Sequence, residues 1–363
     1  MNGAVPAPGD RSTILVITLR RLGDVLLATP LIATLRRAFP QARIDALVFT
    51  GTEGMLAGNR DISNVLTLSL KPGARELLRI GRGLGRRYDV AISTQSGDRP
   101  TGLAIAMGRH SIGLVGRKAA GHWWKSRWLS QSIEERAHEH RVINLARLSD
   151  ALDVPRHLVL TVPQGEAPTH LFPERPYAVL HANPMYAYRR WHRQGWQDLA
   201  RMLSARGLSI VATGGPGADE RAYLDSIWNE AGPPVLRLDG RLDFIANAAL
   251  LAKAAIYVGP DTSMSHLAAA AGCPTVALYG PASPHDIGPW PSGADATPWK
   301  ASGTIQIHGR VAIVQKPLYC LPCQRTGCDN HYLSRSRCLD ELPLSQVLAA
   351  IERVMAAKGR QAS

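Results

Sequence analysis

The sequence has no apolar run that approaches the roughly 20 residues a helix needs to span a bilayer. Its first residues, MNGAVPAPGDRST, lack the basic and apolar segments of a signal peptide. We therefore expect a cytoplasmic protein with no spanning segment. Cysteines number only five, and four of them lie within 19 residues. In a cytoplasmic protein this clustering favours a metal site over disulfides.

Acidic residues are scarce relative to basic ones, with 29 Asp and Glu against 42 Lys and Arg, so the formal net charge is +13. The surplus is uneven, because residues 1–170 hold 23 basic and 14 acidic residues. We expect this first half to face an anionic partner. Nucleic acid, an anionic membrane surface and a phosphorylated substrate all satisfy that charge, and charge alone does not choose among them.

The chain is longer than one hydrophobic core usually allows, and its pattern predicts two α/β units. A domain of residues 1–165 opens with a strand at Ile14–Thr18, a basic turn, and a helix at Asp24–Ala38, which is typical of a doubly wound sheet. Prolines and glycines between Val154 and Pro176 predict the boundary. A second domain then spans 176–345, followed by a C-terminal helix and tail over 346–363. The other elements that we predict are strands Ile44–Phe49, Val65–Leu68, Val90–Ser93, Tyr177–His181, Ser209–Ala212 and Val235–Leu238, and helices Glu134–Leu152, Trp196–Ala205, Asp219–Ala231, Phe244–Ala252 and Leu344–Met355.

The stretch from Ala255 to Tyr279 predicts a strand, a polar turn, an alanine-rich helix and a second strand. Polar residues suited to capping stand where the helix begins: Asp261, Thr262, Ser263 and Ser265. A helix N-terminus at the end of a strand offers free N–H groups and a positive dipole end, which favours an anion such as a diphosphate. Met264 and His266 lie in the same first turn, where His266 can reach that anion. The alternative is a capped core helix in which His266 is only hydrogen-bonded.

Four segments carry a resemblance to a known family, and they stand in this order: ILVITLRRLGDVLLATPLIATLRRAFP, HANPMYAYRRWHRQGWQDLA, VATGGPGADE and DTSMSHLAAAAGCPTVALYGPASP. With them the chain resembles glycosyltransferase family 9, the ADP-heptose:lipopolysaccharide heptosyltransferases, from about Thr13 to Ile351. The resemblance implies an α/β fold of the GT-B type, with two Rossmann-like doubly wound domains facing across a cleft. It also implies that the first domain binds the acceptor and the second domain binds the donor.

The resemblance assigns roles to individual residues. Asp24 stands at the family's proposed catalytic base, although a carboxylate at a helix start also serves as a cap. Arg189 takes the place of a Lys that contacts the donor phosphates, and Ser263 the place of a usual Gly. Asp261 is expected to bind a sugar hydroxyl or to cap its helix. With no Asp-x-Asp pair in the sequence, we expect no cofactor for catalysis, and the helix start with Arg189 and His266 stabilises the leaving diphosphate.

The clustered cysteines have the spacing of a metal knuckle, in which thiolates converge on one tetrahedral ion. Related heptosyltransferases carry a similar cluster that in some cases holds iron. Sulfur ligands alone do not separate a structural zinc from iron. The alternative is four reduced, packed thiols, and Cys273 is expected to be a small core residue. The predicted ligands are Cys320, Cys323, Cys328 and Cys338.

Tryptophans alternate with basic residues in the segment from Arg109 to Leu129, which suits a membrane interface or a sugar platform. Packing between domains is the alternative. We expect peripheral, salt-sensitive binding at the inner face of the inner membrane. The residues expected to make it are Arg117, Lys118, Trp123, Trp124, Lys125, Arg127 and Trp128.

The function predicted from these features is inverting transfer of a heptose from ADP-heptose to a lipopolysaccharide core or a related glycan. The expected partners are a nucleotide-sugar donor, an anionic lipid-linked glycan acceptor and the membrane surface, with no nucleic acid. Transfer of another activated sugar and nucleotide-sugar epimerisation are alternatives on the same fold. A basic nucleic-acid-binding module is a further alternative, but its cysteine stretch carries only three basic residues, Arg325, Arg335 and Arg337.

Overall fold

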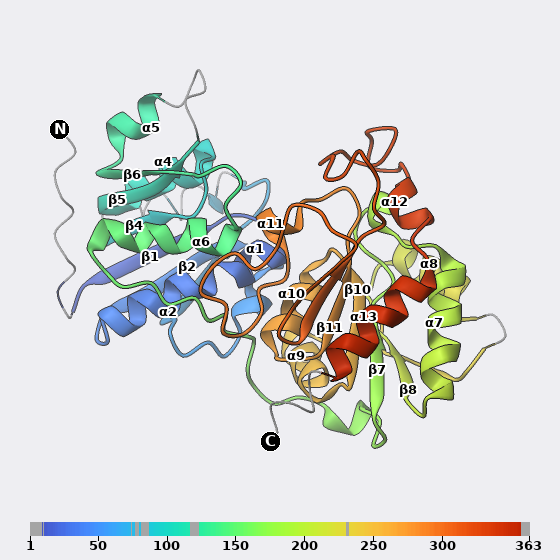
Figure 1. The fold of residues 1–363 in the computed structure, drawn as a ribbon. Helices are drawn as coiled ribbons and strands as arrows, with labels where there is room; N and C mark the ends of the chain where they lie inside the picture. The colour runs from blue at the N-terminus through green and yellow to red at the C-terminus, as the bar shows by residue number, and fades with distance from the viewer. Residues whose placement is uncertain are drawn as a thin grey trace. The chain divides into compact units, whose positions relative to one another are not determined.

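The computed structural model describes residues 9, 11–73, 75–76, 80, 87–116, 123–229 and 232–356 (Figure 1). The chain divides into two compact units, Met1–Pro163 and Gln164–Ser363. This division falls inside the proline-spaced segment between Val154 and Pro176. Within the described ranges, no helix combines the length and the apolar character needed to cross a membrane.

The first unit is built on a sheet of six parallel strands in the order β3-β2-β1-β4-β5-β6. This is the strand order of the Rossmann fold, in which the chain starts at the centre and winds outward in both directions. The strands are β1 (Thr13–Thr18), β2 (Arg43–Phe49), β3 (Asn64–Leu68), β4 (Tyr88–Ser93), β5 (Gly108–Val115) and β6 (Gln131–Glu134). The helices between them include α1 (Leu22–Leu27), α2 (Thr29–Ala38), α4 (Asp98–Met107), α5 (Trp123–Trp128) and α6 (Arg141–Ala146), with 3-10 turns at Glu53–Leu56 and Arg147–Leu152.

Both faces of the central strand β1 are buried, which explains why its residues from Ile14 to Ile17 are all apolar. Ile14 and Val16 pack in one core with side chains of α2 and α6, whereas Leu15 and Ile17 pack in a second core with side chains of α4. Successive strand residues point to opposite faces, so a strand covered by helices on both sides needs apolar residues at every position.

The helix predicted over Asp24–Ala38 is two helices in the structure, so that prediction was wrong in one respect. The break falls at Ala28, because Pro30 has no N–H to donate to the carbonyl of Leu26. The hydroxyl of Thr29 donates to that carbonyl instead, at 2.7 Å. Asp24 consequently lies inside the short helix α1, whose N-cap residue is Arg21, and it is not the cap.

The helix predicted over Glu134–Leu152 is also corrected. Residues up to Glu134 form the edge strand β6, which pairs in parallel with β5, and the helix begins only at Arg141. Glu134 is the one residue of the predicted helix that lies in this strand, and residues 135–140 form no regular element before the helix begins. The imidazole of His140 then caps α6 by accepting a hydrogen bond from the N–H of Val142 at 3.2 Å. Strand β5 itself was not predicted.

The second unit repeats the same winding with one added hairpin. Its sheet has the order β12-β13-β11-β10-β7-β8-β9, and all neighbours are parallel except β12 and β13. The predicted strands and helices of this unit are present, while β12 and β13 were not predicted. Its strands are β7 (Tyr177–Leu180), β8 (Ser209–Ala212), β9 (Val235–Arg237), β10 (Ile256–Pro260), β11 (Thr275–Leu278), β12 (Ile305–His308) and β13 (Val311–Val314).

The helices of the second unit flank this sheet. They include α7 (Arg193–Ala205), α8 (Ala218–Trp228), α9 (Phe244–Lys253), α10 (Ser263–Ala270), α11 (Pro284–Ile287), α12 (Arg337–Asp340) and α13 (Leu344–Ala356), with short turns at Thr169–Leu171 and Ala187–Arg189. The C-terminal helix α13 packs against β11, β13 and α7, so its apolar face joins the core of this unit.

Candidate functional site

Each sheet reverses its strand order at one place, and polar side chains gather at both of these places. The reversal lies between β1 and β4 in the first unit and between β7 and β10 in the second. In open α/β sheets the loops at the carboxyl ends of such neighbouring strands diverge, and ligands bind in the space they leave. Each unit therefore presents one candidate cluster.

In the second unit, α10 begins directly after strand β10, as predicted. Thr262 is its N-cap residue, and the Thr262 side chain makes no capping hydrogen bond. Backbone hydrogen bonds of the helix start with the N–H of Ser265, which donates to the carbonyl of Thr262 at 3.2 Å. The N–H groups of Ser263 and Met264 precede that point, so they belong to the donors that a helix start leaves for an outside acceptor. The dipole of α10 adds positive potential at the same place.

Two other predicted residues of α10, Ser265 and His266, have buried side chains. Ser265 is fully buried and donates its hydroxyl to the carbonyl of Pro260 at 2.6 Å, and it lies 3.1 Å from the hydroxyl of Tyr257. Its side chain therefore ties the helix to strand β10. His266 is also buried, in the first turn of the same helix.

Arg189 and Asp261 form an ion pair at the start of α10. Nη1 of Arg189 lies 2.9 Å from Oδ2 of Asp261 and donates to the Asp261 carbonyl at 3.0 Å. The nearby carboxylate raises the pKa of Arg189, although burial lowers it. The guanidinium also lies over the ring of Tyr188, 5.6 Å from its centroid. The sequence predicted separate roles for the two residues, and the structure brings them together.

Sequence reasoning did not single out His181, which follows β7 at the strand reversal. It is buried, and its Nδ1 lies 3.1 Å from the hydroxyl of Thr213, which follows β8. Burial lowers the pKa of His181 to about 4, so this imidazole is neutral at neutral pH. Two signals were available, because His181 is the last residue of the predicted strand Tyr177–His181 and the first residue of a segment that carries the family resemblance.

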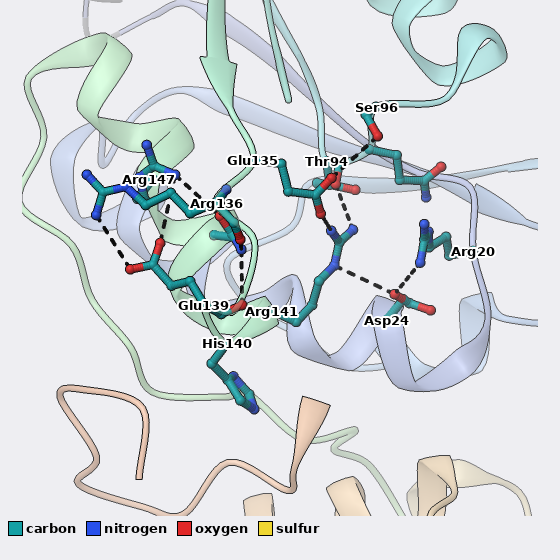
Figure 2. Close-up of polar contacts among 12 residues, drawn as sticks. Arg20, Asp24, Thr94, Ser96, Glu135, Arg136, Glu139, His140, Arg141 and Arg147 are labelled. Atoms are coloured by element: carbon teal, nitrogen blue, oxygen red, sulfur yellow. Dashed lines mark hydrogen bonds and ion pairs between the residues drawn. The ribbon is translucent and has the colours of Figure 1, made fainter. Parts of the chain in front are cut away.

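In the first unit, the carboxylate of Asp24 lies between two arginines (Figure 2). Its Oδ1 is 3.5 Å from Nη1 of Arg20 and 3.7 Å from Nε of Arg141. These distances are those of ion pairs and are too long for hydrogen bonds. In both ion pairs the contact falls on Oδ1.

Arg141 was not identified from the sequence, yet it connects several parts of the cluster. It donates to the carbonyl of Thr94 at 2.7 Å and pairs with Oε1 of Glu135 at 3.1 Å. Burial lowers the pKa of Arg141, and the carboxylates of Asp24 and Glu135 oppose that effect. An arginine stays protonated in proteins, so this buried cation is permanent.

The cysteine stretch lies between β13 and α13 in the second unit. Cys320 and Cys328 are exposed, Cys323 is half-buried, and Cys338 is buried at α12. Burial raises the pKa of Cys338 to about 12, with a further contribution from the three other thiols. Among the residues that the structure describes, no group of three or more His, Cys, Asp or Glu side chains is placed to hold a metal ion. The four-thiolate site expected from the sequence therefore stays a prediction. Cys273 is buried, as predicted.

The predicted surface patch on α5 is only partly present. Trp123 and Trp128 are 75% and 67% exposed, and Arg127 is exposed as well. Lys125 was wrongly included, because it is buried and pairs with Asp98 at 2.8 Å while donating to the Ser96 carbonyl. Trp124 is half-buried with its ring beside Lys125. Arg117 and Lys118 lie outside the described residues.

Comparison with known proteins adds a family match. A model described as glycosyltransferase family 9 (heptosyltransferase) matches residues 77–328. Lipopolysaccharide heptosyltransferase 1 of Pseudomonas aeruginosa is 26% identical, over 92% of this chain and 92% of that protein.

Solved structures give the same result for the fold. The glycosyl transferase family 9 protein of Veillonella parvula is similar with a TM-score of 0.74 at 18% identity, covering 95% of this chain and 97% of that one. Heptosyltransferase WaaC of E. coli with ADP has a TM-score of 0.70 at 18% identity, covering 94% and 99%. Together with the two Rossmann-like sheets, these similarities confirm the predicted GT-B type of fold.

Proposed function

Because the chain belongs to glycosyltransferase family 9, we propose that it transfers a heptose from ADP-heptose to a lipopolysaccharide core or related glycan. The donor binds at the strand reversal of the second unit, and the acceptor hydroxyl is activated by Asp24 in the first. The reaction inverts the configuration of the anomeric carbon in a single displacement.

The observation that carries this proposal is the start of α10 beside Arg189. The first N–H groups of α10, the helix dipole and a guanidinium meet there, at the position in the sheet where nucleotides bind in this fold. Such a site suits a diphosphate in particular, because its charge grows when the bond to the sugar breaks.

Asp261 pairs with Arg189, and the two side chains are proposed to contact different parts of the donor. The guanidinium keeps its charge beside the carboxylate and offers its remaining N–H groups to the phosphates. The carboxylate is then placed to accept a hydrogen bond from a hydroxyl of the sugar that the diphosphate carries. Arg189 replaces the Lys found in related proteins, so a planar fork takes over from a compact ammonium.

The proposed reaction balances with one proton transfer. The acceptor oxygen forms a bond to the anomeric carbon as the bond from that carbon to the ADP oxygen breaks. The hydroxyl proton passes to the carboxylate of Asp24, and the electron pair of the broken bond leaves with ADP. Oδ2 is the oxygen proposed to receive the proton, since both arginine contacts fall on Oδ1.

We further propose that the protein works at the inner membrane surface on an anionic, lipid-linked acceptor. Trp123 and Trp128 are exposed on α5 next to the exposed Arg127. Exposed tryptophans suit the headgroup region, and each basic side chain near an anionic leaflet contributes about 1 kcal/mol. The basic surplus of residues 1–170 agrees with this location.

An Asp24→Asn variant tests the proposed base. The side chain keeps its size, and the N-cap residue of α1 is Arg21, so the fold should persist. Turnover of ADP-heptose in the presence of acceptor should fall by about 10²-fold or more, because general-base assistance is lost. Near-normal turnover in a folded Asp24→Asn protein would remove Asp24 from the mechanism.

A further inference from the structure

We propose that Arg141 is a positioning residue for the catalytic carboxylate of Asp24. In this role it does not touch the substrate, and it fixes the orientation of the group that does. The inference rests on the proposed role of Asp24 as the base, and it concerns a residue that the family motifs in this chain do not include.

The first step is that Arg141 is itself rigidly held. Its Nη2 donates to the carbonyl of Thr94, at the carboxyl end of β4, at 2.7 Å. Thr94 is in turn fixed to β1, because its N–H and its hydroxyl both donate to the carbonyl of Ile17, at 3.1 and 2.9 Å. The guanidinium is therefore anchored to the two strands between which the sheet reverses its order.

The second step is the contact with Asp24, which approaches from α1 (Figure 2). Nε of Arg141 and Nη1 of Arg20 both face Oδ1, at 3.7 and 3.5 Å. The side chain of Arg141 is only 8% exposed, whereas that of Arg20 is 51% exposed. Solvent screens a buried charge much less than an exposed one, so Arg141 is the stronger constraint. Holding Oδ1 limits rotation of the carboxylate, and in the proposed role it keeps Oδ2 for the acceptor.

The third step is that the buried charge of Arg141 is balanced on its other side. Glu135 pairs with Nη1 at 3.1 Å, and its second oxygen accepts from the hydroxyl of Ser96 at 3.4 Å. The buried ammonium of Lys125 donates to the carbonyl of the same Ser96. Because Glu135 shares the guanidinium, Asp24 need not form a tight pair with it and stays available to accept a proton.

A purely structural role is the alternative, since breaking any buried arginine pair destabilises a protein. The chain offers a matched control in Arg147, whose side chain is 12% exposed. It lies in the turn that follows α6, pairs with Glu139 at 3.8 Å, and donates to the carbonyl of Glu134 at 2.8 Å (Figure 2). Loss of Arg147 therefore removes a half-buried cation whose ion pair and hydrogen bond involve Glu139 and Glu134 and not Asp24.

The experiment measures kcat, the KM for ADP-heptose and the melting temperature of the full chain. The acceptor is O-deacylated lipopolysaccharide from heptose-deficient cells, and release of ADP is followed. In Arg141→Ala, kcat should fall by roughly 10- to 100-fold, as misplacement of a catalytic group by about 1 Å does, while the donor KM stays unchanged. Added guanidinium should restore part of kcat in this variant. Arg147→Ala should lower the melting temperature but leave kcat unchanged.

The Asp24→Asn background supplies the decisive comparison. If Arg141 acts through Asp24, then adding Arg141→Ala to Asp24→Asn should cause no further loss of kcat. Additive losses, or an equal loss of kcat in Arg147→Ala, would overturn the positioning role. Near-normal turnover in Asp24→Asn alone would instead remove Asp24, and with it the positioning role, from the mechanism. Absence of ADP-heptose turnover in the unchanged chain would overturn the proposed function. Should Arg141→Ala fail to fold, Arg141→Lys and Glu135→Gln carry the same comparison, because each disturbs the network while keeping a similar volume.

Discussion

Replacing Arg189 with alanine should weaken ADP binding and stability by separable amounts. The guanidinium lies at the start of α10, where its remaining N–H groups can reach a phosphate. A hydrogen bond to a charged group contributes about 1.5 to 3 kcal/mol, which corresponds to a roughly 10- to 100-fold rise in the Kd for ADP.

The same substitution leaves Asp261 without its partner. The Asp261 side chain is only 6% exposed, but that of Arg189 is 30% exposed, so the full cost of breaking a buried pair does not apply. We expect a loss of about 1 to 2 kcal/mol in the free energy of unfolding. Adding Asp261→Asn removes the unpaired charge and should recover part of that stability. It should not recover the affinity for ADP, because the phosphate contact is still missing.

Calorimetric titration with ADP and denaturant unfolding measure the two effects on the same samples. Arg237→Ala is the matched control, since Arg237 pairs with Asp239 at 2.7 Å on the edge strand β9. It should lose stability and keep the Kd for ADP. Unchanged ADP affinity in Arg189→Ala would refute a phosphate contact by this arginine. Full recovery of affinity in Arg189→Ala/Asp261→Asn would show that Arg189 only neutralises Asp261.

His181 binds a proton at about pH 4 in the folded chain and near pH 6.5 when unfolded, so it should cost up to about 3 kcal/mol of stability as the pH falls through this range. Denaturant unfolding at several pH values should show a smaller loss in His181→Asn, and equal losses would refute this role. Trp123→Ala/Trp128→Ala should abolish sedimentation with anionic vesicles at low salt without lowering the melting temperature, whereas unaltered binding would count against a membrane-facing α5. Elemental analysis of protein purified without nickel should find about one zinc or iron per chain, and metal-free protein of full stability would exclude the site predicted at Cys320, Cys323, Cys328 and Cys338.

Much of the fold was predictable because apolar runs and turn residues mark buried parallel strands well. The second unit followed its pattern closely from Tyr177 to Leu278, including α10 and the strands on either side of it. The errors arose where a local signal met a tertiary constraint. Pro30 divides a helix that periodicity alone extends, and Glu134, predicted as the start of a helix, instead pairs with β5 at the end of β6.

The candidate site was predictable only as far as its residues lie in local motifs. Asp24, Arg189 and the start of α10 each follow a strand, and their segments carry the family resemblance. Arg141 has no such signal, because its importance depends on the packing of α6 against strand ends that are distant in the sequence. For Lys125 the sequence predicted a surface role that the structure does not show. A basic residue near tryptophans was expected to be exposed, but Lys125 is buried, where it pairs with Asp98 and donates to the Ser96 carbonyl.

Mass spectrometry of the acceptor is the direct measurement of heptose transfer from ADP-heptose. The purified chain is incubated with ADP-heptose and with O-deacylated lipopolysaccharide from heptose-deficient cells, beside a reaction that contains another nucleotide-activated sugar. The acceptor should gain the mass of one heptose with ADP-heptose, and the Asp24→Asn protein should give far less of this product. An acceptor that stays unmodified with ADP-heptose, or that gains mass only with the other sugar donor, would contradict it.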